Sequence, residues 1–154
     1  LGVHMILLLQ AGASALGVRA LVDEEHDEWL AHKVIKKYVV RGSGKAQSTH
    51  LKTKGKSRYG SRLRLQNHRR LLDQLHERVV AQAAEYGPID HLWIGAPDRL
   101  LAEFLAATPG LPISEQRTHR LPFATNRPGF DELERTWRRI SRGRWTRNPG
   151  ASPG

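Results

Sequence analysis

The sequence contains no cysteine, and this absence excludes several kinds of chemistry at once. Without a thiol the chain has no disulfide framework, no thiolate ligand for a metal and no cysteine nucleophile. The absence fits a reducing compartment, and we therefore expect the protein in the cytoplasm.

The chain also lacks a long apolar run. Nothing approaches the ~20 consecutive apolar residues of a membrane-spanning helix, so we expect no membrane partner. The stretch Met5–Leu9 is too short for a secretory signal, and no Lys or Arg precedes it. The first four residues, Leu1–His4, look unlike a natural start, which suggests an added segment or a start inside a longer protein.

Acidic residues are missing from one region of a strongly basic chain. The 154 residues, which fit one domain, carry a formal net charge of +10 at pH 7. The segment Lys33–Arg70 holds 13 of the 25 Lys and Arg residues and no Asp or Glu, which leaves 12 basic residues against all 15 acidic ones in the remainder. A local excess of this size is typical of a protein with a polyanionic partner.

The spacing of apolar residues predicts an α/β domain. We expect strands at Ile6–Gln10, Ala15–Val22, Trp29–Val40, Ile89–Gly95 and Arg117–Phe123, with a turn at Asp23–Asp27. We expect helices from Ser61, a plausible N-cap, to Tyr86, over Pro97–Ala107, and over Phe130–Ser141. Strands that alternate with helices indicate a layered domain, which we place at residues 1–145, with a flexible polar tail at 146–154.

The stretch Gly42–Gly60 has almost no apolar residues, so it is predicted to be a mobile loop. Within it, Gln47 is a neutral amide among small residues, and Gly42 and Gly44 let the backbone approach a ligand closely. An amide orients water and donates to a developing oxyanion, but it cannot act as a general base near neutral pH. Gln47 therefore suits ester hydrolysis in which the substrate supplies the acid–base chemistry.

Cations on both sides of Gln47 would supply sequence-independent, salt-sensitive contacts to RNA phosphates. The candidate RNA-binding residues are Lys33, Lys36, Lys37, Arg41, Lys45, His50, Lys52, Lys54, Lys56, Arg58, Arg62 and Arg64. From residue types alone, a solvated loop that binds RNA without catalysis is the more common use of such a run.

The residues do not favour a metal site. His32, His50 and His68 have no second ligand at helical spacing with carboxylate support. The acids of the Asp23–Glu28 stretch fit a solvated turn. A two-metal nuclease would need more inward-facing carboxylates than Asp90 and Asp98 offer. We expect neither a metal nor another cofactor.

Several motifs together resemble a known family. They are His32-Lys-Val-Ile-Lys-Lys-Tyr-Val-Val-Arg41, Gly44-Lys-Ala-Gln47, Lys52-Thr-Lys-Gly-Lys-Ser-Arg58 with Gly60-Ser-Arg62, and Leu121-Pro-Phe-Ala-Thr-Asn-Arg-Pro128 with Phe130-Asp-Glu-Leu133. The chain resembles, from about Leu16 to about Trp145, the release-factor-like peptidyl-tRNA hydrolases of ribosome-associated quality control. The bacterial branch is the most similar, and the family is related to the middle domain of the eukaryotic class-one release factor.

The resemblance implies a middle-domain, RNase H-like fold with a mixed sheet flanked by helices. It also implies that Gln47 enters the peptidyl transferase centre of the large ribosomal subunit, with Gly44 as the loop glycine. Lys45 and Ala46 stand where classical release factors have glycine, which is similar to the quality-control branch. The implied partners are the large subunit, its rRNA and peptidyl-tRNA, bound by a monomer.

Two alternatives to ester hydrolysis remain open at this point. The domain could cut the tRNA near its 3′ end and leave nucleotides on the peptide. It could also be a noncatalytic module that binds the ribosome or tRNA through Lys33–Arg70.

Overall fold

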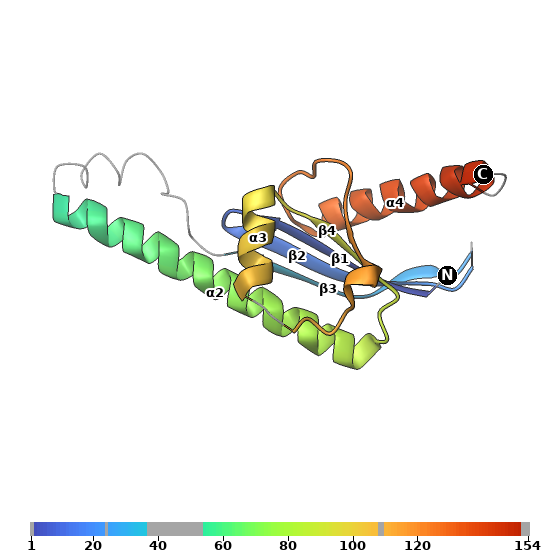
Figure 1. Ribbon diagram of the computed structural model, residues 1–154, viewed down its shortest axis with the longest axis horizontal. Coiled ribbons are helices and arrows are strands. Elements are labelled where there is room, and N and C mark those ends of the chain that lie inside the picture. The colour runs from blue at the N-terminus through green and yellow to red at the C-terminus, as the bar shows by residue number, and fades with distance from the viewer. Residues whose placement is uncertain (1, 24, 37–53, 108–109, 152–154) are drawn as a thin grey trace.

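The computed structural model describes residues 2–23, 25–36, 54–107 and 110–151 (Figure 1). Five strands form one mixed sheet in the order β3-β2-β1-β4-β5. Their bounds are β1 (Gly2–Gln10), β2 (Ala13–Leu21), β3 (Asp27–Lys36), β4 (His91–Gly95) and β5 (Thr118–Arg120). β2 pairs antiparallel with β1 and β3, whereas β4 pairs parallel with both β1 and β5. Consequently β1, β3, β4 and β5 all end at one edge of the sheet, here called the carboxyl edge.

The central strand β1 is covered on both faces. All of its residues from Met5 to Leu9 are fully buried, in agreement with the continuous apolar run that a doubly covered strand needs. The turn from β1 to β2 contains Gly12, whose φ of 77° favours glycine. This turn lies at the carboxyl edge.

Helices cover the two faces of the sheet. α2 (Lys54–Tyr86) and α3 (Asp98–Ala107) lie on one face, and α4 (Phe130–Ala151) lies on the other (Figure 1). A short 3-10 turn, η1 (Glu115–Arg117), precedes β5. On the α2 side Leu71, Leu75 and Val79 pack against the sheet, and on the α4 side Leu133, Trp137 and Ile140 do so. This arrangement confirms the expected α/β fold, a mixed sheet flanked by helices.

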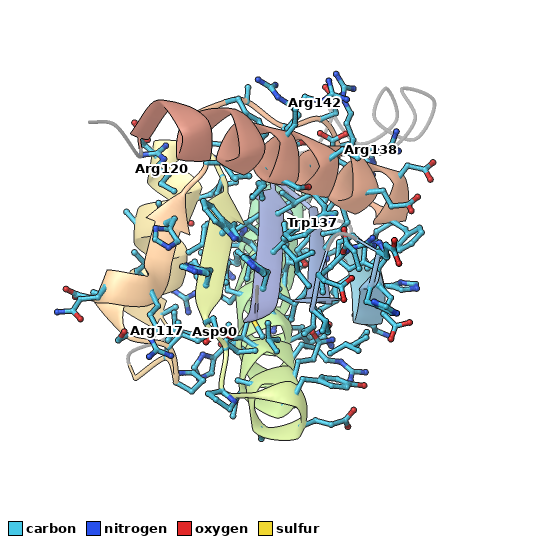
Figure 2. All side chains as sticks on the ribbon, turned by 90° about the vertical axis from the view of Figure 1, so that its right-hand side faces the viewer. Asp90, Arg117, Arg120, Trp137, Arg138 and Arg142 are labelled. Atoms are coloured by element: carbon cyan, nitrogen blue, oxygen red, sulfur yellow. The ribbon has the colours of Figure 1, made fainter. Side chains whose placement is uncertain are left out.

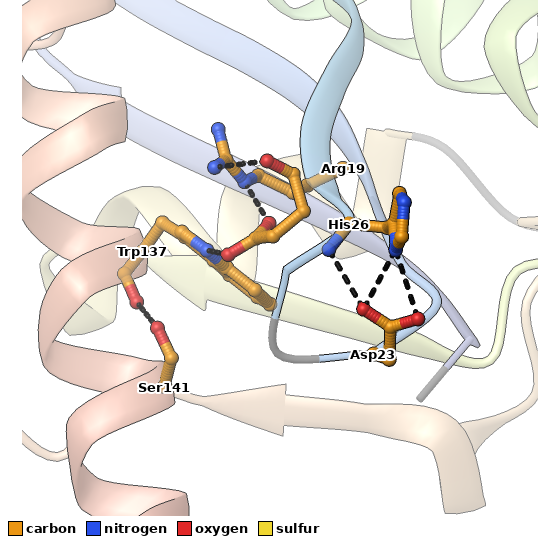
Figure 3. A network of polar contacts seen from close by, with 6 residues as sticks. Arg19, Asp23, His26, Trp137 and Ser141 are labelled. Atoms are coloured by element: carbon orange, nitrogen blue, oxygen red, sulfur yellow. Dashed lines mark hydrogen bonds and ion pairs between the residues drawn. The ribbon is translucent and has the colours of Figure 1, made fainter.

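A hydrogen bond from Trp137 to Asp27 links α4 to the sheet (Figure 3). The indole Nε1 of Trp137 donates to Asp27 Oδ2 at 2.8 Å, while Arg19 forms an ion pair with the same carboxylate. The guanidinium of Arg19 also lies 4.9 Å from the centre of the Trp29 ring. Asp27 is therefore a structural residue, and the solvated turn predicted for Asp23–Glu28 is wrong at this position. Asp23 does fit that prediction, because its exposed carboxylate accepts hydrogen bonds from the backbone of Glu25 and His26.

Several predicted boundaries are wrong. The first strand is predicted to begin at Ile6, but β1 begins at Gly2, and the His4 side chain within it is completely buried. α2 begins at Lys54 rather than Ser61, so residues 54–60 are helical and not part of a loop. α4 continues to Ala151 rather than ending at Ser141, and β5 covers three residues rather than Arg117–Phe123. The division of the chain at residue 145 stays a prediction.

No helix in the described part of the chain is both long enough and apolar enough to cross a membrane.

Candidate nucleic-acid interface

The two residues predicted to be catalytic, Gly44 and Gln47, lie outside the described residues. So do five of the predicted RNA-binding residues, Lys37, Arg41, Lys45, His50 and Lys52. The structure does fix the two elements that bound their segment. β3 ends at Lys36 on the carboxyl edge, and α2 begins at Lys54.

The carboxyl edge is where ligands bind in many open α/β sheets. Here a groove of about 450 Å³ lies against the ends of β1 and β4, and its lining includes Gln10, Pro97 and Phe123. The Gln10 amide donates from Nε2 to the carbonyls of Thr125 and Asn126, each at 3.0 Å. These bonds tie the 121–128 motif to the end of the central strand. The motif therefore has a structural role at the carboxyl edge, the edge at which β3 also ends.

The first half of α2, residues 54–70, is called the α2 arm. A 33-residue helix is about 50 Å long at 1.5 Å per residue, and Figure 1 shows the start of α2 extending beyond the sheet. None of residues 62–70 is buried, whereas Leu71 is the first of the helix's buried apolar residues among those described. The α2 arm therefore projects from the domain, and in the sequence it follows directly on residues 37–53, which include Gln47.

The charge of the α2 arm is unusual for a helix start. Its first turn contains no acidic residue, although the amino end of a helix dipole is positive and favours Asp or Glu. Lys54, Lys56 and Arg58 lie in the first two turns, and beyond them Arg62 is exposed and Arg64 is half-buried. The dipole and the cations add to the same positive potential, so an anionic ligand would be stabilised here.

A contact between α2 and α3 fixes the direction of the α2 arm. His68 Nε2 lies 2.5 Å from Glu103 Oε2, and Arg99 Nε donates to the other carboxylate oxygen at 3.3 Å. The hydrogen bond from His68 is the main cause that lowers the pKa of Glu103, with a smaller contribution from Arg99. Beside this contact runs a largely apolar groove of about 790 Å³, whose lining includes Arg64, Leu65 and Leu100.

Lys33 and Lys36 come together with α2 residues in a different groove. A hollow of about 540 Å³ between the edge strand β3 and α2 is lined by both lysines and by Gln74, Glu77 and Arg78. The predicted cations that the structure describes therefore do not form a single patch. Lys33 and Lys36 border one side of α2, and Arg64 borders the side that faces α3.

Arg78 was missed by the sequence analysis because it lies outside the acid-free segment, beside Glu77. Only the packing of β3 along α2 brings Arg78 next to Lys33. No sequence signal indicates which helix face would line that edge strand.

Among the residues that the structure describes, no three His, Asp or Glu side chains are grouped so as to hold a metal ion. Asp98 pairs with Arg120 at the carboxyl edge, and Asp90 lies at the opposite edge, where its carboxylate accepts from the backbone N–H of Val3 at 2.8 Å. The two acids considered for a nuclease site are thus separated by the length of β4. In Figure 2 Asp90 lies toward the lower end of the sheet and Arg120 toward its upper end.

Comparison with one solved structure supports the fold. The chain is 16% identical to the structure described as "Vms1 mitochondrial localization core", with a TM-score of 0.55, and the match covers 88% of this chain and 53% of that one. The chain thus spans about half the length of that structure. The archaeal translation termination factor aRF1 matches at 9% identity and a TM-score of 0.44, over 99% of this chain and 42% of the other.

No curated protein matches the chain significantly in sequence. The sequence pattern of the family described as "Bacteroidetes VLRF1 release factor" matches residues 4–147. These residues include every described strand except the start of β1, as well as α2, α3 and most of α4. The chain therefore belongs to the Bacteroidetes VLRF1 release factor family.

Proposed function

We propose that this protein hydrolyses peptidyl-tRNA and so frees nascent chains on stalled large ribosomal subunits. Membership in a release-factor family supports this function. The observation that carries it is the position of the two described elements on either side of the Gln47 segment: β3 ends at Lys36 on the carboxyl edge, and the basic α2 arm begins at Lys54. Gln47, a neutral amide, therefore precedes in the sequence a helix whose positively charged start favours an anionic ligand.

Binding and chemistry have separate residues in this proposal. Cations of the α2 arm and of β3 contact RNA phosphates and position the segment. Gln47 and Gly44 then supply the reactive tip, with glycine allowing the backbone to enter a narrow cleft. Because each phosphate contact is electrostatic, salt would weaken binding but not the step at the ester.

The reaction is hydrolysis of an ester. A water oxygen attacks the carbonyl carbon of the peptidyl ester, and the bond between that carbon and the ribose oxygen of the tRNA breaks. The peptide leaves as a carboxylic acid, and the tRNA oxygen takes up a proton. The Gln47 amide accepts a hydrogen bond from the attacking water through its oxygen and donates from its nitrogen to the oxyanion, so it needs no change of protonation.

The proposal places the protein in the cytoplasm as a monomer with the large subunit, its rRNA and peptidyl-tRNA as partners. It uses no metal and no organic cofactor.

Replacement of Gln47 tests the proposal directly. In Gln47→Ala the loss of one positioned donor is expected to lower the release rate by about 10²–10³-fold on purified large subunits that carry peptidyl-tRNA. Binding to the same subunits is expected to stay at the wild-type level. Ser48→Ala, one residue away in the same segment, is the matched control and should release peptide at the wild-type rate.

Two results would overturn the proposal. Wild-type release by Gln47→Ala would remove the catalytic role and leave a noncatalytic binding module. A tRNA product shortened at its 3′ end, with nucleotides left on the peptide, would show tRNA cleavage in place of ester hydrolysis. The proposal predicts an intact 3′ end.

A further inference from the structure

A second segment of the chain is free of acidic residues. From Arg135 to the last residue the sequence holds six arginines, no lysine and no Asp or Glu. Residues 33–70 hold 13 basic residues and this segment holds six, so 19 of the 25 Lys and Arg residues lie in two acid-free segments. The remaining six share the rest of the chain with all 15 acidic residues, which brings that part close to −9.

Four arginines of this segment lie on one face of α4. Arg135, Arg138, Arg139 and Arg142 follow the spacing i, i+3, i+4, i+7, which places them on neighbouring turns of one side of a helix, and all four are exposed. Leu133, Trp137 and Ile140 pack the other side against the sheet. Figure 2 shows Trp137 directed to the sheet, with Arg138 and Arg142 directed away from it.

Arg135 and Arg138 differ from several other arginines of the domain, whose charges pair with carboxylates of the fold. Arg19, Arg99 and Arg120 each pair with a carboxylate of the fold. No ion pair between described residues involves Arg135 or Arg138. Arg139 lies with its guanidinium 3.9 Å from the centre of the Phe123 ring, which holds it on the 121–128 motif. The charges of Arg135 and Arg138 therefore remain available for an external anion.

The later turns of α4, which carry Arg138 and Arg142, lie far from the α2 arm. Trp137 contacts Asp27 and His4, which are near the starts of β3 and β1, so the later turns of α4 are at the edge of the sheet opposite the carboxyl edge. α2 and α4 also cover opposite faces of the sheet. In Figure 1 the start of α2 and the end of α4 extend from opposite ends of the molecule.

We propose that Arg135, Arg138 and Arg142 on α4 bind the phosphate backbone of RNA, as an anchor separate from the α2 arm. The choice of RNA rests on the proposed function. Arginine suits this role because its planar guanidinium donates two parallel hydrogen bonds to one phosphate. The three residues span about 10 Å along the helix, which is enough to reach more than one phosphate. The domain then holds RNA at two places, and only the one beside Gln47 takes part in the reaction.

A lipid surface fits the arginine face less well than RNA does. A helix that lies in a membrane interface inserts an apolar face, but the apolar face of α4 is already buried against the sheet. An acidic protein is the remaining alternative, and the experiment below separates it from RNA.

The test measures RNA affinity against salt concentration for the full chain. The probe is a labelled 20-nucleotide RNA strand of mixed sequence. The triple variant Arg135→Gln, Arg138→Gln, Arg142→Gln should lower the slope of log affinity against log salt by about two, since each lost phosphate contact removes about 0.7. Affinity near 100 mM salt should fall roughly a hundredfold, which is a slope change of about two over the one decade between 1 M and 0.1 M salt. Arg99→Gln is the matched control, because Arg99 is 91% exposed but already paired with Glu103, and it should leave the slope unchanged.

A lysine variant separates the charge of the face from its geometry. Arg135→Lys, Arg138→Lys, Arg142→Lys should keep the salt slope and lose only part of the affinity, because lysine preserves the charge but not the paired hydrogen bonds. A melting curve for each variant shows whether it is folded. Since the replaced side chains are exposed, a folded glutamine variant is expected.

The outcomes distinguish this inference from the proposed function. An unchanged slope and affinity in the glutamine variant would overturn the anchor, whatever the Gln47 variant does. Lost binding to poly-glutamate together with unchanged RNA binding would also overturn it in favour of an acidic protein. Peptide release by the glutamine variant at saturating protein should equal that of the wild type, whereas Gln47→Ala should bind the RNA probe with wild-type slope.

Discussion

Gly17 on β2 shows how closely the α4 layer packs on the sheet. A Cβ at this position would lie 2.5 Å from Cζ3 of Trp29 and 3.3 Å from Cδ1 of Leu133. Trp29 cannot move freely, because the Arg19 guanidinium lies over its ring and Arg19 is held by Asp27. One added methyl group must therefore disturb the contact that holds α4.

We predict that Gly17→Ala lowers the free energy of unfolding by about 1–3 kcal/mol, the usual cost of overpacking a tight core. Urea denaturation measures this as a lower midpoint at unchanged m-value. Gly129→Ala is the matched control, since nothing lies within 4 Å of a Cβ built there. A loss of stability in Gly129→Ala as large as that in Gly17→Ala would contradict the explanation by packing.

At the scale of elements, the contact between α2 and α3 gives a pH-dependent prediction. Glu103 has a lowered pKa in the folded protein, chiefly through its hydrogen bond with His68. A carboxyl whose folded pKa lies below its ordinary value of 4.5 stabilises the fold above that value, and the contribution is lost as the pH falls through the folded pKa. Glu103→Gln should therefore cost stability at neutral pH and cost little in strong acid.

The loss of stability in Glu103→Gln is expected to be small, because the Glu103 side chain is 36% exposed. We expect about 0.5–1 kcal/mol near pH 7, measured by urea denaturation at several pH values. Glu77→Gln on α2 serves as control, because Glu77 is exposed and takes part in no ion pair between described residues. A difference between wild type and Glu103→Gln that stays constant from pH 7 to pH 3 would refute the assignment to this carboxylate.

The start of α2 gives a prediction in which stability and RNA binding change in opposite directions. Lys56 lies in the first turn of a helix that has no acidic residue there. Lys56→Glu should raise the free energy of unfolding by about 0.3–1 kcal/mol, because the negative charge meets the positive end of the helix dipole. The same change should weaken RNA binding and lower the salt slope by about one or more.

Lys56→Gln should fall between wild type and Lys56→Glu in both measurements. If Lys56→Glu lowered stability and RNA affinity together, the loss of binding would be explained by a damaged helix, and the role of the α2 arm in RNA binding would have no support.

For the molecule as a whole, the fold could largely be predicted, because the apolar residues of its strands and helices form clear patterns in the sequence. The run from Met5 to Leu9 indicates a strand, and the helical spacing of Leu72, Leu75 and Val79 indicates a helix. The ends of elements were predicted less well. Residues 54–60 have poor helix formers and few apolar residues, so composition predicted a loop, whereas in the structure they extend a helix whose later turns pack on the sheet.

The candidate site was predictable only in part. The resemblance and the charge count identify residues 33–70, but they do not show that Lys33 meets Arg78 across a groove. The second acid-free segment was also missed, because its six arginines were counted together with acidic residues of distant elements. The net charge of the sequence does not indicate the arginine face of α4. That face is recognised only from the spacing of the arginines along the helix and from the burial of the helix's other face.

The central claim is that basic surfaces bind RNA and a neutral amide carries out the reaction. The most direct test is a single-turnover release assay on large subunits that carry peptidyl-tRNA, run over a range of protein concentrations. The half-saturating concentration measures binding, and the maximal rate measures the reaction. Glutamate replacements at Lys52, Lys54 and Lys56 should raise the half-saturating concentration at least tenfold and leave the maximal rate nearly unchanged. Gln47→Ala should lower the maximal rate about 10²–10³-fold at unchanged half-saturation. A Gln47→Ala protein that reaches the wild-type maximal rate would contradict the account.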